Sequence, residues 1–91
     1  MVYVHLRLNV TDYTKWRAGF DANEARRRAA GSNGVNQIFC DVDNPNNVSL
    51  IMEWDQADKA QAFLNDPMTK QVMDNAGVTG RPSLFTVQTR M

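Results

Sequence analysis

Residues 2–10 alternate strictly between two kinds of side chain. One set is aliphatic, and it comprises Val2, Val4, Leu6, Leu8 and Val10. The other set mixes an aromatic ring, an imidazole, a guanidinium and an amide, and it comprises Tyr3, His5, Arg7 and Asn9. A period of two predicts a β-strand whose two faces differ in chemistry.

The pattern changes to a helical period after Thr11-Asp12, a pair that supplies an N-cap. We expect a helix over residues 12–30, ended by Gly31 at the C′ position. Aromatic residues spaced by three and four form one stripe along it, at Tyr13, Trp16 and Phe20. This stripe predicts which side of the helix faces the core.

The stripe turns polar in its second half, where it continues through Asn23, Glu24 and Arg27. Burying polar groups over a sheet from which water is excluded costs free energy, so two interpretations stay open. In one, the helix overhangs the sheet and these groups meet water, with Glu24 paired to Arg27 or Arg28. In the other, they point into a wet cavity and orient a polar ligand.

The middle of the chain predicts a hairpin, with strands over 35–42 and 48–54 and a turn in "DNPNN" between them. By the parity of the first strand, Trp54 would lie under the helices, with its indole N–H at the rim. Glu53 would lie on the other face. Cys40 is expected to be a buried, inert thiol.

The last third of the chain predicts a second helical segment and a final strand. Asp55 is the expected N-cap of a helix whose inward face includes Phe63. The pair Asp66-Pro67 restarts the helix, and Gly77 ends it. A loop over 77–82 leads to an alternating strand over 83–90, with Phe85, Val87 and Thr89 on one face and Leu84, Thr86, Gln88 and Arg90 on the other.

The resulting order is β-α-β-β-α-β, in one domain over residues 1–91. Right-handed crossovers favour a four-stranded antiparallel sheet with both helices on one face, which is the ferredoxin-like α+β arrangement. The bare face would hold Tyr3, His5 and Arg7 together with apolar side chains, and it is too apolar to leave in water. We therefore expect a homodimer whose two sheets pack face to face.

Glu53 raises a question about that interface, because a buried carboxylate needs a partner. If the first and third strands are adjacent and parallel, Glu53 lies beside Arg7 or His5. We therefore predict that Tyr3, Arg7 and Glu53 are interface residues, with Glu53 as a charge partner across the dimer.

Composition narrows the function classes. Ten basic and ten acidic residues cancel, which argues against a nucleic-acid partner. No apolar stretch approaches the ~20 residues of a membrane span, and "MVYVHLRLNV" is unlike a signal peptide. A single cysteine cannot form an intramolecular disulfide. We expect a cytoplasmic protein with no membrane partner.

Three segments, "DYTKWRAGFD", "DVDNPNNVSLIMEWD" and "AFLNDPMTKQVMDNAGV", together with the order of the elements, are similar to the antibiotic biosynthesis monooxygenase-like domains of the dimeric α+β barrel superfamily. The resemblance covers the whole chain. It implies a homodimer whose sheets form a barrel, with a small-molecule cavity between sheet and helices in each subunit. Some members oxidise aromatic substrates with molecular oxygen and no metal or flavin. Others degrade haem with a histidine on a helix, and residues 67–76 contain none.

The first hypothesis is therefore a cofactor-independent monooxygenase that acts on an aromatic or quinol-like substrate and holds no metal or cofactor. The substrate would contact Trp16, Phe20, Asn23, Glu24, Trp54 and Phe63. His5, the only side chain that titrates near neutrality when unperturbed, or Arg27 would stabilise the substrate anion. The second hypothesis is a non-catalytic ligand-binding or interaction module on the same fold.

Overall fold

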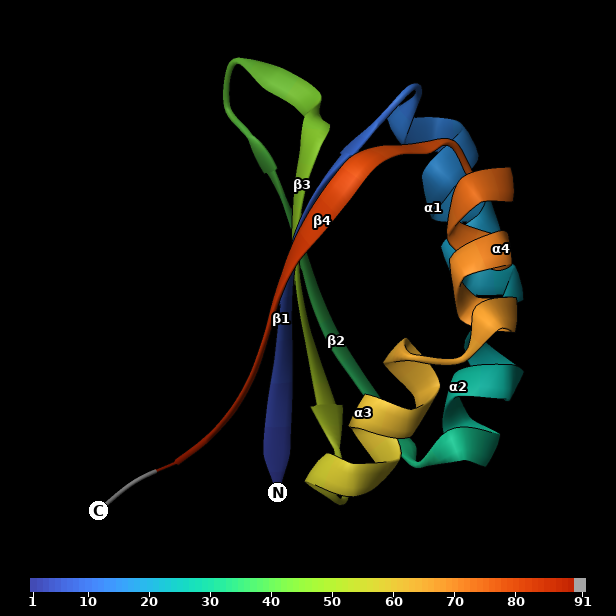
Figure 1. The fold of residues 1–91 in the computed structure, drawn as a ribbon. Coiled ribbons are helices and arrows are strands. Elements are labelled where there is room, and N and C mark those ends of the chain that lie inside the picture. Colours follow the sequence, from blue (N-terminus) through green and yellow to red (C-terminus); the bar gives the residue numbers. More distant parts are fainter. Residues whose placement is uncertain (90–91) are drawn as a thin grey trace.

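The computed structural model describes residues 1–89. Its elements are β1 (Val2–Val10), α1 (Tyr13–Ala22), α2 (Glu24–Ala30), β2 (Ser32–Asp41), β3 (Asn44–Trp54), α3 (Ala57–Leu64), α4 (Pro67–Asn75) and β4 (Val78–Gln88). The strands form one antiparallel sheet in the order β2-β3-β1-β4. The helices all lie on one side of this sheet, and the other side is open (Figure 1). The expected ferredoxin-like α+β fold is confirmed.

The core forms where the aliphatic face of β1 meets the helices. Alternate residues of β1 and β3 are buried, as their period of two predicts. Trp54 at the end of β3 is completely buried, and its ring centroid lies 5.2 Å from that of Phe63 on α3. The buried apolar residues are Val2, Val4, Leu6, Leu8, Val10, Trp16, Val48, Leu50, Met52, Trp54, Ala60 and Phe63. Trp54 Nε1 is also buried and finds no hydrogen-bond partner, so the expectation that it reaches the rim is wrong.

The first helical segment is broken at Asn23, where a continuous helix was expected. Asn23 has φ −96° and ψ 8°, which ends α1 and starts α2. The carbonyl of Phe20 accepts from the backbone N–H of Asn23 at 3.2 Å and from Arg27 Nη1 at 2.7 Å. These donors satisfy a carbonyl that a broken helix leaves free. Gly31 ends α2 with φ 128°, a conformation that favours glycine.

The hairpin between β2 and β3 is tighter than its sequence predicts. Asp41 pairs with Asn44, so only Val42 and Asp43 form the turn, and β3 begins at Asn44. Cys40 on β2 is exposed, which corrects the expectation of a buried thiol. Its strand lies at the edge of the sheet.

The second helical segment agrees with the sequence except at its start. Gln56, in an extended conformation, precedes α3 as its N-cap, so Asp55 is not the cap. Asp66 caps α4 by accepting from the backbone N–H of Met68 at 2.9 Å, and Pro67 occupies the first helical position. The last strand begins at Val78 and includes the expected loop, because β4 is an edge strand that tolerates Pro82. Arg90, expected in this strand, lies outside the described residues.

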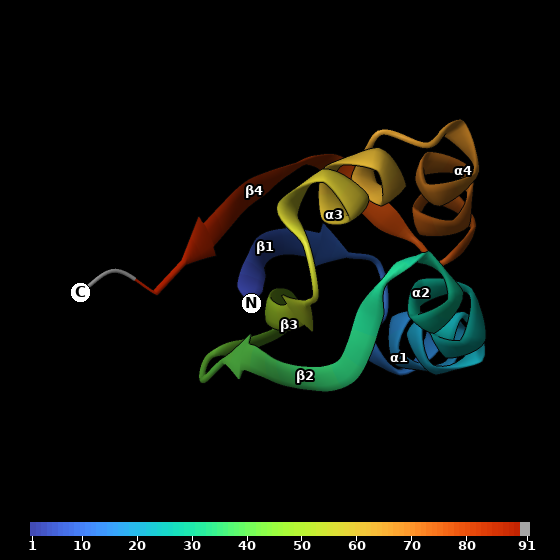
Figure 2. The ribbon, with the colours of Figure 1, turned by 90° about the horizontal axis from the view of Figure 1, so that it is seen from below.

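The bare face corrects the predicted pairing of Glu53. Strands β1 and β3 are adjacent but antiparallel, so Glu53 lies opposite Tyr3 instead of Arg7. Its carboxylate accepts from Asn33 Nδ2 at 3.0 Å. Arg7 instead contacts Asp41 at 2.6 Å and Ser49 at 2.8 Å. The view from below shows α1, α2 and α4 on one side of the strands, with β2 and β4 as the outer strands (Figure 2).

Candidate functional site

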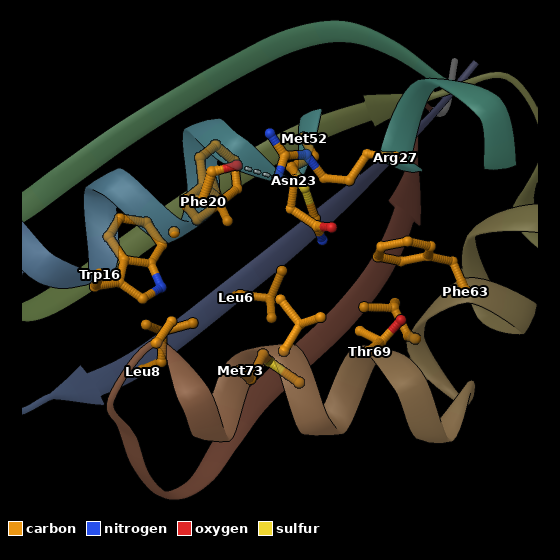
Figure 3. Close-up of a pocket in the computed structure, with 15 residues that line it drawn as sticks. Leu6, Leu8, Trp16, Phe20, Asn23, Arg27, Met52, Phe63, Thr69 and Met73 are labelled. Atoms are coloured by element: carbon orange, nitrogen blue, oxygen red, sulfur yellow. Dashed lines mark hydrogen bonds between the residues drawn. The ribbon is translucent and has the colours of Figure 1, made fainter. Parts of the chain in front are cut away.

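A cleft lies between the sheet and the helices, and it is the best candidate for a small-molecule site. It encloses about 540 Å³ including its open mouth, with an inner cavity of about 60 Å³. Its floor comes from β1 and β3, and its walls come from α1, α2, α3 and α4 (Figure 3). The lining residues are Leu6, Leu8, Trp16, Gly19, Phe20, Asn23, Arg27, Leu50, Met52, Phe63, Leu64, Thr69, Val72, Met73 and Ala76.

Aromatic rings form much of its wall. Trp16 and Phe20 lie one helical turn apart on α1, and their ring centroids are 5.2 Å apart in a stacked arrangement. Phe63 closes the opposite end from α3, as Figure 3 shows. Flat rings in this arrangement suit a ligand that is itself flat and apolar.

Among residues 1–89, Arg27 is the only charged residue in the lining. Its side chain enters from α2, only 4% of the residue is exposed, and its guanidinium carbon lies 3.6 Å from the centroid of Phe20. Burial lowers the pKa of Arg27 from its usual value, although Glu24 and Asp21 partly oppose this effect. The guanidinium is therefore a cation in an apolar surrounding, where each of its interactions is stronger than in water.

Two uncharged polar side chains share the lining with Arg27. Thr69 on α4 is 5% exposed, and its Oγ1 is buried without a hydrogen-bond partner. Asn23, at the junction of α1 and α2, points into the space above α4 in Figure 3. The cleft therefore combines apolar walls with three polar groups that can orient a ligand.

The cavity is narrow, but parts of its wall can adjust. Met52 on β3 and Met73 on α4 face it from opposite sides. Methionine side chains are unbranched and flexible, so they can change rotamer around a ligand at low cost. A bound ring would therefore widen the inner cavity by moving side chains while the backbone stays in place.

The structure brings together five of the residues that the sequence singled out for ligand contact. Trp16, Phe20, Asn23, Arg27 and Phe63 all line the cleft. Which of them contact a ligand stays a prediction.

The structure places the other candidates elsewhere. Trp54 is buried behind Phe63 and does not line the cleft. Glu24 is exposed and lies 3.9 Å from Arg28, which is the pairing expected if the helix meets water there. His5 is exposed on the bare face and lies opposite Ile51 and Phe85, so within one chain it does not reach the cleft.

None of the candidate site residues named from the sequence came from α4. Thr69, Val72 and Met73 line the cleft from this helix. Their spacing of three and four does indicate one helical face, but only Val72 and Met73 are apolar. The sequence did not indicate that Thr69 lines the cleft, because a threonine near the start of a helix is usually exposed.

Among residues 1–89, no group of three His, Cys, Asp or Glu side chains is arranged to hold a metal ion. Within the same residues, no helix is both long enough and apolar enough to cross a membrane.

Among known proteins, only solved structures match this chain. No family model matches the chain, and no curated protein matches it. Solved structures do match over almost its whole length. A candidate antibiotic biosynthesis monooxygenase from Bordetella bronchiseptica superposes with a TM-score of 0.78 at 14% identity, covering 99% of this chain and 97% of its own. The chain has the fold of the antibiotic biosynthesis monooxygenase-like proteins.

Two further solved structures share this fold. An antibiotic biosynthesis monooxygenase matches with a TM-score of 0.72 at 12% identity, covering 100% of both chains. SnoaB from Streptomyces nogalater, a cofactor-independent oxygenase, matches with a TM-score of 0.64 at 20% identity, covering 99% of this chain and 95% of its own. At these identities the likeness establishes the fold, and the chemistry has to be argued from the cleft.

Proposed function

We propose that this protein binds a ring-containing, largely apolar small molecule in the cleft between sheet and helices and oxygenates it without a cofactor. One observation carries the proposal: stacked aromatic rings and a single buried cation line the same cleft. The cofactor-independent oxygenase among the structural neighbours supports the choice of reaction. The expectation of a cytoplasmic protein belongs to this proposal and is supported by the single cysteine.

In such a reaction the substrate itself supplies the electrons. In the keto tautomer of a ring phenol, one ring carbon carries two hydrogens, and this carbon reacts with molecular oxygen, R₂CH₂ + O₂ → R₂C=O + H₂O. One oxygen atom enters the substrate, and the other leaves as water with both hydrogens. The cleft would hold the ring between Trp16 and Phe63, exclude water from it, and place Arg27 near the oxygen that becomes negative.

We further propose that two chains associate through their bare sheet faces. That face carries Phe39, Ile51, Phe85 and Val87, and Phe85 is 64% exposed in one chain. An apolar surface of this kind is rarely left in water. In this arrangement His5, Tyr3 and Arg7 would lie at the interface, where a second copy covers them.

A non-catalytic binding module is the second candidate, and one observation favours it. Arg27 is the only ionisable residue that lines the cleft, and arginine does not act as a base near neutrality. The one histidine lies on the opposite face of the sheet. A substrate that ionises only with a general base would therefore be bound without being converted.

Oxygen consumption with a panel of quinols and hydroxylated aromatics tests the reaction, and a pair of variants tests the cleft. Val72→Phe places a ring in the lining, whereas Gln71→Phe adds the same ring on the exposed side of the same helix. We expect Val72→Phe to weaken ligand binding at least about tenfold by excluding the ligand, with Gln71→Phe close to the unmodified protein.

The outcomes separate the alternatives. Oxygen uptake that Val72→Phe abolishes supports the oxygenase. Binding without oxygen uptake supports the module. If no ligand of the panel shifts the melting temperature, or if both variants behave alike, the cleft is not the ligand site.

A further inference from the structure

A second hollow lies between α2 and α3, which are side by side in Figures 1 and 2. It has a volume of about 260 Å³ and opens to solvent, so we call it the outer pocket. Its lining residues are Arg26, Ala30, Lys59, Ala62, Phe63 and Asp66. Among the residues that the structure describes, Phe63 alone lines both the outer pocket and the cleft. One phenylalanine ring therefore separates two hollows.

Neither hollow is large enough by itself for a typical ligand. The inner cavity of the cleft has a volume of about 60 Å³, and the outer pocket has about 260 Å³. Pockets that hold drug-sized molecules enclose about 300–1,000 Å³. If the ring of Phe63 turns aside, the two hollows join, and their combined volume reaches that range. The joined space then extends from Trp16 on α1 to Ala62 on α3.

A flexible side chain covers Phe63 on the side of the outer pocket. The guanidinium carbon of Arg26 lies 4.6 Å from the centroid of the Phe63 ring, and Arg26 Nη2 donates to Asp66 at 3.2 Å. The side chains of Arg26 and Asp66 are 27% and 47% exposed, so water screens this ion pair. We call the pair the clasp, because it joins α2 to the residue that caps α4.

The clasp leaves one of its own groups unsatisfied. Arg26 Nη1 is buried and has no hydrogen-bond partner. A buried donor without a partner costs free energy, and water satisfies it once the side chain swings outward. Phe63 itself lies one residue before the end of α3 at Leu64, and positions at the end of an element readily absorb a conformational change. The contacts that keep Phe63 between the two hollows are therefore weak.

We propose that Phe63 is a movable partition and that the outer pocket is a second compartment of the ligand site. The ligand is then an elongated molecule with two apolar parts. Its first ring lies in the cleft against Trp16, and a second ring or chain passes the displaced Phe63 and lies against Ala30 and Ala62, whose small side chains leave room for it. This inference rests on the proposed function, because it extends the ligand site of that same cleft.

Two uncharged alcohols test the second compartment. Benzyl alcohol has one ring, and 4-phenylbenzyl alcohol carries a second ring in line with the first. On the unmodified protein, we expect the longer alcohol to bind at least about tenfold more tightly in isothermal titration calorimetry, because a second ring leaves water. Val72→Phe, which fills the cleft, should weaken the binding of both alcohols.

A pair of variants on α3 separates the outer pocket from a general preference for apolar molecules. Ala62→Phe fills the outer pocket from an exposed residue that does not line the cleft. Gln61→Phe adds the same ring at an exposed neighbour that lines neither hollow. We expect Ala62→Phe to bind the longer alcohol at least about tenfold more weakly and benzyl alcohol as before. Gln61→Phe should leave both affinities unchanged.

Neutralising one of two nearby arginines tests the clasp. Arg26→Gln removes the ion pair with Asp66 and the cation over Phe63. Arg28→Gln removes the same charge from an exposed residue that lines neither hollow. Because the clasp favours the closed arrangement, we expect Arg26→Gln to bind the longer alcohol about threefold more tightly, through a larger population of the open arrangement. Arg28→Gln should bind it like the unmodified protein.

These measurements distinguish the inference from the proposed function. A loss confined to the longer alcohol in Ala62→Phe, together with a gain in Arg26→Gln, supports it. If Ala62→Phe weakens both alcohols alike, or if Gln61→Phe has the same effect, the outer pocket is not part of the site. The cleft still stands in that case, provided that Val72→Phe weakens benzyl alcohol.

Two further results would overturn the inference. An unchanged or weaker affinity of Arg26→Gln for the longer alcohol means that no closed arrangement has to open, which contradicts a partition at Phe63. If neither alcohol binds at the limit of its solubility, the cleft fails as a ligand site, and the second compartment fails with it.

Discussion

The two faces of the sheet are made by the same strands, yet they differ in almost every physical respect. On the helix side of β1 and β3, the side chains are aliphatic or aromatic and buried. On the other side, His5 and Arg7 are exposed beside large apolar groups such as Phe85 and Phe39. The covered face forms the core and the floor of the cleft, whereas the bare face exposes apolar and charged side chains side by side. The comparison separates residues that form the core of the chain from residues that the proposed dimer would cover.

Breaking the covered face should have the largest effect. Trp54 is 0% exposed and packs against Phe63, so Trp54→Ala leaves a large cavity in the core. We expect a loss of about 3–5 kcal/mol in the free energy of unfolding, measured by urea denaturation. Phe85→Ala removes a ring from the bare face instead and should leave the unfolding of the dilute, monomeric chain within about 0.5 kcal/mol. Equal effects of the two variants would contradict the contrast between the faces.

Charging the bare face should affect assembly more than folding. Ile51→Glu and Phe85→Glu place carboxylates in the centre of the proposed dimer interface. We expect the dissociation constant of the dimer to rise about 30-fold to 1,000-fold, measured by sedimentation equilibrium.

Met68 provides the control for that experiment. It is 53% exposed on α4, outside the sheet, so Met68→Glu adds the same charge away from the proposed interface. Its dimer should dissociate like the unmodified one. If the unmodified chain is monomeric at all concentrations, the proposed dimer is wrong.

The smallest effect should come from the ion pair on the bare face. The hydrogen bond from Arg7 lowers the pKa of the Asp41 carboxyl, with help from Asn47. Because the folded-state pKa is the lower one, the pair contributes stability above the unfolded pKa of about 4 and loses it as pH falls through the folded value. Asp41→Asn should remove this pH-dependent part, so the melting temperatures of the two proteins should converge in acid. A constant difference across the acid range would show that Asp41 acts by other means.

The fold was predictable because its strongest signals are local. The strict alternation of β1 and the burial of Trp54 both follow from a period of two. The break at Asn23 was not predictable, since asparagine is only mildly unfavourable in a helix and the apolar stripe continues past it. The sequence did not predict the start of β4, because Gly80 and Pro82 are typical of a loop. An edge strand nevertheless tolerates them.

The candidate site was predictable only in part, and the reason differs for each residue. Trp16, Phe20 and Arg27 share one side of a helical segment, so their common position could be read from spacing. The placement of Glu53 was wrong because the direction of β3 was misjudged. The crossover through α1 and α2 makes β2 parallel to β1, and the hairpin then reverses the chain, so β3 runs antiparallel to β1. Thr69 lines the cleft from another helix, a position that becomes apparent only after folding.

Cys40 has a practical consequence for the question of assembly. It is the only cysteine of the chain, and it is exposed on β2, near the end of an edge strand. One nitroxide spin label per chain can therefore be attached without any substitution. If two chains stack sheet on sheet, the two electron spins of each particle will show a single well-defined separation in a dipolar resonance measurement, and a solitary chain will show none.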